Sequence, residues 1–110
     1  MKGFGGLGDM AGMLRQAQKM QQEVERIQAD LKTRHVEGSA GGGAVKAIAN
    51  GQQELVSLKI DPAAIDPQDP SMLEDLVLAA VQNALKASRE LMATELKKAT
   101  GGMGLPGMGL

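Results

Sequence analysis

Apolar residues recur at alternating intervals of three and four along the first third of this chain. They are Met10, Met13, Ala17, Met20, Val24, Ile27 and Leu31, called here the apolar seam. Such spacing places side chains on one face of an α-helix and is typical of a helix that packs against a partner. We expect a helix over residues 9–33, with Asp9 as its N-cap. Residues 1–8 are rich in glycine, which favours a flexible arm.

Large side chains are scarce, which limits the core that the chain can build alone. The 110 residues include no Trp, Tyr or Cys and one Phe, and smaller side chains bury less area each. The length fits one domain, and a small domain with a thin core often needs a second subunit. We therefore expect a two-fold homodimer. Its predicted interface is Met13, Ala17, Met20, Val24, Ile27 and Leu31.

Alternating apolar and polar residues in the middle of the chain predict three short strands. They cover residues 35–39, 44–49 and 54–60, separated by a glycine turn at 40–43 and by Asn50-Gly51, whose residues both accept positive φ. Val56, Leu58 and Ile60 fall on one side of the third strand. We expect an antiparallel meander with one buried face.

A second long helix follows three Asp-Pro pairs. Asp69 is its expected cap and Pro70 its first residue, and an apolar stripe that includes Leu73, Val77 and Leu91 continues the pattern to about Thr100. Residues 101–110, rich in Gly and Met, predict a flexible tail. The expected fold is α+β, with a single domain over residues 9–100.

Charge is distributed unevenly although the formal net charge is only −1. Residues 1–34 carry six Lys or Arg against four Asp or Glu, residues 35–80 two against seven, and residues 81–110 four against two. Arg15, Lys19 and Arg26 fall within about 40° of one another on the helix face opposite the apolar seam. This basic stripe is either a solvated surface or a site for a polyanion, and a dimer would present it twice.

Other chemistry finds little support in the residues. The glycine patterns at 3–8 and 38–43 lack the strand, lysine and helix that a nucleotide-binding loop requires. His35 is the only histidine and there is no cysteine, so we expect no metal site and no cofactor. An enzyme subunit that uses His35 is the least favoured hypothesis, because a lone histidine is more often a surface residue, and we expect no catalytic residues and no small-molecule substrate. Without a secretory signal or a long apolar run, we expect a cytoplasmic protein with no membrane segment.

The order of these elements, together with particular motifs, resembles the YbaB/EbfC family of bacterial nucleoid-associated proteins. The resemblance spans nearly the whole chain and is carried by the Gln-rich segment 16–21, the turn 36–43, Val45-Lys46, Asn50-Gly51, segments 60–62 and 72–77, Ala79-Ala80, Asn83-Ala84 and the tail motif at 102–106.

This resemblance implies a subunit of order α-β-β-β-α and a tweezer-like homodimer without enzymatic activity. It also implies binding of double-stranded DNA in the nucleoid through the long helices. On charge geometry, the candidate DNA-binding residues are Arg15, Lys19, Arg26, Lys86, Arg89, Lys97 and Lys98. With no aromatic residue in the helices to stack on bases, we expect weak sequence preference. The alternative is a protein-interaction adaptor that uses the Met-rich helix face and tail.

Overall fold

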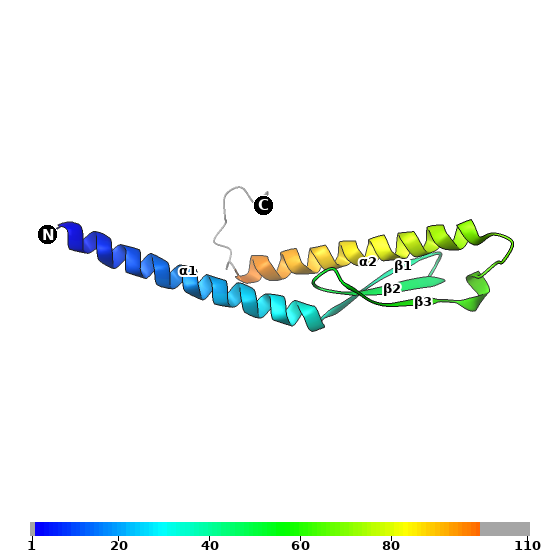
Figure 1. Ribbon diagram of the computed structural model, residues 1–110, viewed down its shortest axis with the longest axis horizontal. Coiled ribbons are helices and arrows are strands. Elements are labelled where there is room, and N and C mark those ends of the chain that lie inside the picture. Colours follow the sequence, from blue (N-terminus) through cyan, green and yellow to red (C-terminus); the bar gives the residue numbers. More distant parts are fainter. Residues whose placement is uncertain (1, 100–110) are drawn as a thin grey trace.

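The structure, a computed structural model, describes residues 2–99, and the side chains from residue 9 onward. Helix α1 (Lys2–Thr33) leads into strands β1 (His35–Ala40), β2 (Val45–Asn50) and β3 (Leu55–Ile60), then into a short 3₁₀ helix η1 (Pro62–Ala64) and helix α2 (Pro70–Ala99) (Figure 1). The predicted α+β order and antiparallel meander are therefore confirmed. The predicted tail over residues 101–110 lies outside the described residues.

The sheet has the order β1-β2-β3, and α2 covers one face of it. Val45, Ala47 and Ala49 of β2 are fully buried against Ala80 and Ala84 of α2. Small side chains on both surfaces let the helix approach closely. Gly38 in β1 marks the closest approach, because a Cβ there would lie 2.1 Å from the backbone nitrogen of Ala84.

One strand of the predicted buried face is left largely uncovered. Helix α2 packs mainly on β1 and β2, and Leu55, Val56 and Leu58 of β3 remain 50%, 50% and 43% exposed. A register shift between Ile48 and Ala49 also alters the predicted alternation. Leu55, rather than Val56, lies opposite buried Ala49, because a bulge adds a residue to one strand.

The turn between β2 and β3 differs from the predicted two-residue turn. Neither Asn50 nor Gly51 has positive φ; Gln53 does, at 62°. The Asn50 side chain instead accepts hydrogen bonds from the backbone N–H groups of Gln52 and Glu54, at 2.9 and 3.0 Å. Gly51 is required for space, since a Cβ there would lie 2.6 Å from a methyl carbon of Leu31.

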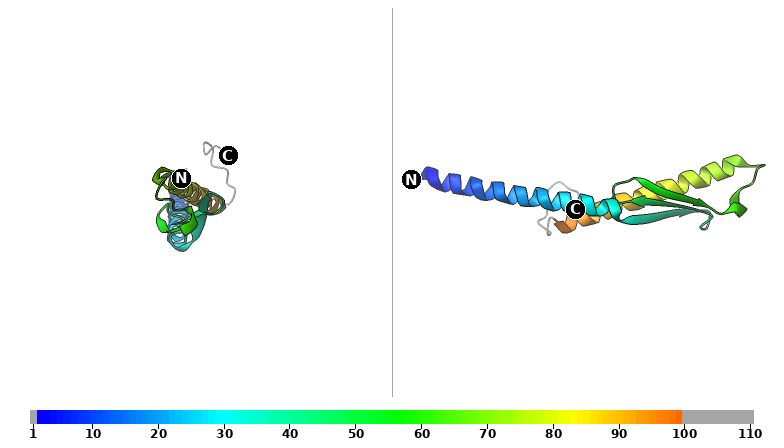
Figure 2. Two further views of the ribbon diagram at one scale, coloured as in Figure 1. Left: turned by 90° about the vertical axis from the view of Figure 1, so that its right-hand side faces the viewer. Right: turned by 60° about the horizontal axis from the view of Figure 1, so that its bottom comes forward.

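Helix α1 extends well beyond the rest of the molecule, as Figures 1 and 2 show. It begins at Lys2 and not at the predicted Asp9. Glycine can adopt helical dihedrals at a cost of about 1 kcal/mol relative to alanine, so a helix already formed can continue through such a segment. The longest dimension of the chain is consequently 82 Å, against 25 and 17 Å for the other two.

Helix α2 begins as predicted. A carboxylate oxygen of Asp69 accepts hydrogen bonds from the backbone N–H of Met72 at 3.3 Å and from the hydroxyl of Ser71 at 3.1 Å. Pro70 occupies the first helical position, where no N–H is needed. At the other end, Lys97 and Lys98 lie in the last turn, where positive charge complements the helix dipole.

Candidate nucleic-acid interface

The projecting part of α1, which contains Arg15 and Lys19, is called here the α1 arm. It presents these two cations to solvent. Arg15 and Lys19 are exposed, and they lie one helical turn apart beside Gly12 and Gln16. Within the part of the chain whose side chains are described, residues 9–99, neither forms an ion pair. Two predicted site residues are therefore exposed cations without an ion pair among these residues.

Arg26 belongs to the same stripe but has a partner. Its guanidinium donates to both carboxylate oxygens of Glu23, at 2.5 and 3.3 Å. The hydrogen bond from Arg26 lowers the pKa of Glu23, so this carboxylate stays ionised and offsets the arginine charge. Arg26 can contact a phosphate only in competition with Glu23.

The four predicted cations of α2 do not form one cluster. Lys86, Arg89, Lys97 and Lys98 are all exposed. Lys86 points away from the sheet, because it lies about opposite buried Ala84 around the helix. Arg89 and Lys97 border an apolar pocket of about 380 Å³ that Met92 and Leu96 also line. Lys98 donates to Glu95 at 3.3 Å.

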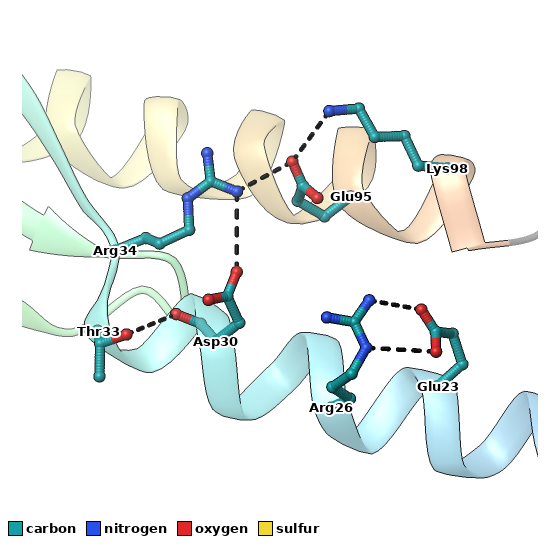
Figure 3. Close-up of polar contacts among 7 residues, drawn as sticks. All are labelled: Glu23, Arg26, Asp30, Thr33, Arg34, Glu95 and Lys98. Carbon is teal, nitrogen blue, oxygen red and sulfur yellow. Dashed lines mark hydrogen bonds and ion pairs between the residues drawn. The ribbon is translucent and has the colours of Figure 1, made fainter.

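An ion-pair cluster that sequence reasoning missed lies where α1 meets the C-terminal end of α2 (Figure 3). Arg34, just past the end of α1, contacts Glu95 of α2 at 3.0 Å and Asp30 of α1 at 4.0 Å. Hydrogen bonds from Arg34 and then from Lys98 lower the pKa of Glu95. No local spacing predicts the contact between Arg34 and Glu95, because these two residues are far apart in sequence.

The residues of the predicted dimer interface differ in how far one chain already covers them. Ile27 and Leu31 are 5% and 0% exposed within a single chain, because the base of α1 packs on α2 and on the β2–β3 turn. Both side chains therefore belong to the core of the single chain. Met20 and Val24 are half-buried, whereas Met13 is 70% exposed.

A second exposed apolar surface lies outside the apolar seam of α1. It combines Leu55 and Leu58 of β3 with the neighbouring flank of α2, and is called here the β3 surface. Helical spacing places Leu78, Val81, Leu85, Met92 and Leu96 on one flank of α2. That flank borders the β2–β3 turn, because Gln53 lines the same pocket as Met92. Leu78 is 57% exposed there.

The remaining sequence candidates stay isolated. His35 is exposed at the start of β1. Over the described residues there is no cluster of three His, Cys, Asp or Glu side chains that could hold a metal ion. Neither helix, over those same residues, combines the length and apolarity that crossing a membrane requires.

Comparison with known proteins assigns a class to this geometry. The YbaB/EbfC DNA-binding family matches residues 6–103. A nucleoid-associated protein of Moorella thermoacetica is 57% identical over 102 residues, covering 93% of this chain and 98% of that protein. A nucleoid-associated protein of Thermoanaerobacter sp. (strain X514) is 49% identical over 106 residues, covering 96% of each chain.

A solved structure shares the fold. The crystal structure of an uncharacterized protein from Helicobacter pylori superimposes with a TM-score of 0.64 at 26% identity, covering 77% of this chain and 86% of that one. The fold of two helices and three strands is thus shared with a protein of known structure. The chain belongs to the YbaB/EbfC DNA-binding family.

Proposed function

We propose that this protein is a nucleoid-associated protein that binds double-stranded DNA as a homodimer, through cations on its long helices and with weak sequence preference. The observation that carries the proposal is the α1 arm, which projects from the body and presents Arg15 and Lys19, neither of which forms an ion pair among residues 9–99. Membership of a DNA-binding family supports duplex phosphate as the polyanion that these residues would contact.

The cations favour contacts to phosphate over contacts to bases. Described side chains of the two helices include no aromatic residue that could stack on a base, and the exposed cations are long and flexible. Phosphate contacts carry no sequence information by themselves. Binding should therefore vary little among duplexes of different sequence.

Dimerisation is supported by apolar surface that one chain leaves uncovered. The β3 surface exposes about half of Leu55 and Leu78, and the α1 arm exposes Met13 at 70%. Exposed apolar patches of this kind are typical of interfaces. A second copy would cover them and would double the number of cations available to one duplex.

The adaptor hypothesis also has an observation in its favour. Met10, Met13 and Leu14 are 67%, 70% and 62% exposed at the outer half of α1, and methionine side chains adapt to varied protein partners. In that alternative the arm binds proteins, and the association is driven by apolar contacts.

Fluorescence anisotropy with labelled duplexes tests the proposal against this alternative. Two duplexes of equal length and unrelated sequence should bind with affinities within about tenfold of each other, and both should weaken as salt is raised. Sedimentation of the same sample should give the mass of two chains. A folded protein that binds neither duplex at low salt would leave the adaptor as the better account.

A further inference from the structure

Helix α1 is attached to the body only by its last turns among the residues that the structure describes. Leu31 packs against Gly51, whose N–H donates to the Leu31 carbonyl at 2.8 Å. The Gln52 side chain donates to the carbonyl of Gln28 at 2.6 Å. Both contacts lie at the β2–β3 turn, and the site that they form around Leu31 is called here the pivot. The α1 arm, further toward the N-terminus, projects away from the body.

A separate contact joins the end of α1 to α2. Arg34 approaches Glu95 at 3.0 Å, whereas the pairs Arg26–Glu23 and Lys98–Glu95 each lie within one helix. The Glu95 side chain is 18% exposed, compared with 42% for Glu23. Partial burial reduces screening by solvent, so the pair should be worth more than an exposed one.

The direction of the α1 arm therefore depends on the buried packing of Ile27 and Leu31 at the base of α1, next to the pivot, and on the ion pair between Arg34 and Glu95. Arg34 also contacts Asp30, one turn earlier on α1, at 4.0 Å. The guanidinium thus lies between a carboxylate of α1 and a carboxylate of α2, as Figure 3 shows.

We propose that Glu95 is a positioning residue for DNA binding, which fixes the α1 arm relative to α2 through Arg34. In this way the cations of both helices are held in one orientation before DNA arrives. The inference rests on the proposed function for its DNA-binding part, whereas the effect on arm direction stands independently of it.

Spin labels can measure the direction of the arm. The chain has no cysteine, so Gln18→Cys on α1 and Gln82→Cys on α2 supply two specific attachment points at exposed positions. Dilution of the doubly labelled chain into excess unlabelled chain limits the measured distance to one subunit. We expect a narrow distance distribution in the parent protein and a broad one in both Glu95→Gln and Arg34→Gln.

Charge-matched controls separate positioning from simple electrostatics. Glu90→Gln removes a carboxylate from α2, and Lys32→Gln removes a cation from α1, both at exposed positions. These controls should keep the narrow distribution. If Glu95 and Arg34 act as one unit, the double variant should be no broader than either single variant.

DNA affinity completes the test, because the two variants change the charge in opposite directions. Electrostatics alone predicts tighter binding for Glu95→Gln and weaker binding for Arg34→Gln. Positioning predicts that each binds more weakly than its own charge-matched control. If a freed arm lies in the DNA-binding orientation about one third of the time, DNA affinity falls about threefold per arm. For the two arms of a dimer, the loss of affinity is about tenfold.

The outcomes are distinguishable. Unchanged distance distributions in both variants would overturn the positioning role. Broadened distributions with affinities equal to those of the controls would show that arm direction does not matter for binding, which also overturns it. If the parent protein does not bind DNA, the proposed function fails, while the distance measurements still decide whether Glu95 fixes the arm.

Discussion

Replacing Gly38 with alanine should destabilise the protein strongly, although alanine adds a single methyl group. The new Cβ would lie 2.1 Å from the backbone nitrogen of Ala84, 2.6 Å from the carbonyl oxygen of Ala80 and 2.7 Å from the Ala84 Cα. Ordinary contacts begin near 3.4 Å, and all three atoms belong to the α2 backbone. No side-chain rotation relieves the overlap, so α2 must move by more than about 1 Å.

That movement loosens the core, which sets the expected magnitude. Val45, Ala47, Ala80 and Ala84 are all fully buried at this contact. Overpacking relieved by small shifts costs about 1–3 kcal/mol, and displacement of a helix backbone places Gly38→Ala at the upper end. For a domain of this size, a loss of about 3 kcal/mol lowers the melting temperature by roughly 10–20 °C.

Urea and thermal unfolding followed by far-ultraviolet circular dichroism measure this loss. Parent and variant must be compared at equal chain concentration, because the stability of a dimer depends on it. Gly12→Ala is the matched control, since a Cβ there meets nothing within 4 Å. It should stabilise α1 by about 0.5–1 kcal/mol. A Gly38→Ala variant within about 0.5 kcal/mol of the parent would refute the close approach of β1 and α2.

Three further results are expected. Ile27→Asp should unfold the chain rather than only separate the dimer, because Ile27 is 5% exposed within one subunit; a folded monomer by sedimentation and circular dichroism would contradict this. Leu58→Asp, at a side chain 43% exposed, should weaken the dimer while circular dichroism stays unchanged; an undiminished dimer would remove the β3 surface from the interface. The lowered pKa of Glu95 means that its carboxylate stays ionised, and keeps its contact with Arg34, from neutral pH down to the ordinary glutamate pKa of 4.5. The contact is lost only below that pH, so the spin-label distance distribution should broaden only in that acidic range. Broadening already at neutral pH would contradict the assigned ionisation of Glu95.

Much of the architecture follows from local patterns. The seam predicts the long first helix, alternation predicts three strands, and Asp69-Pro70 marks the start of α2. Each of these depends on neighbours in sequence. The bulge opposite Ala49 and the positive φ of Gln53 depend on how strands and turn fit together, and alternation alone does not reveal them.

The candidate site was less predictable, because it depends on contacts between residues that are far apart in sequence. Periodicity identifies which residues of α1 share a face, but it does not tell which of them the same chain covers. Leu31 is covered because Gly51 leaves space for it, and Arg34 meets Glu95 because α1 and α2 end side by side. Glu95 and the β3 surface are consequences of tertiary packing.

The salt dependence of duplex binding tests the central claim most directly. Each phosphate contact contributes about −0.9 to the slope of log affinity against log salt concentration. Replacing Arg15, Lys19 and Arg26 together by Gln removes up to six contacts from a dimer and should make the slope shallower by as much as about 5. The control, Lys32→Gln with Lys46→Gln and Lys59→Gln, removes equal charge from exposed positions elsewhere and should keep nearly the parent slope. A triple-variant slope equal to the parent slope would contradict the claim that the α1 arm carries DNA binding.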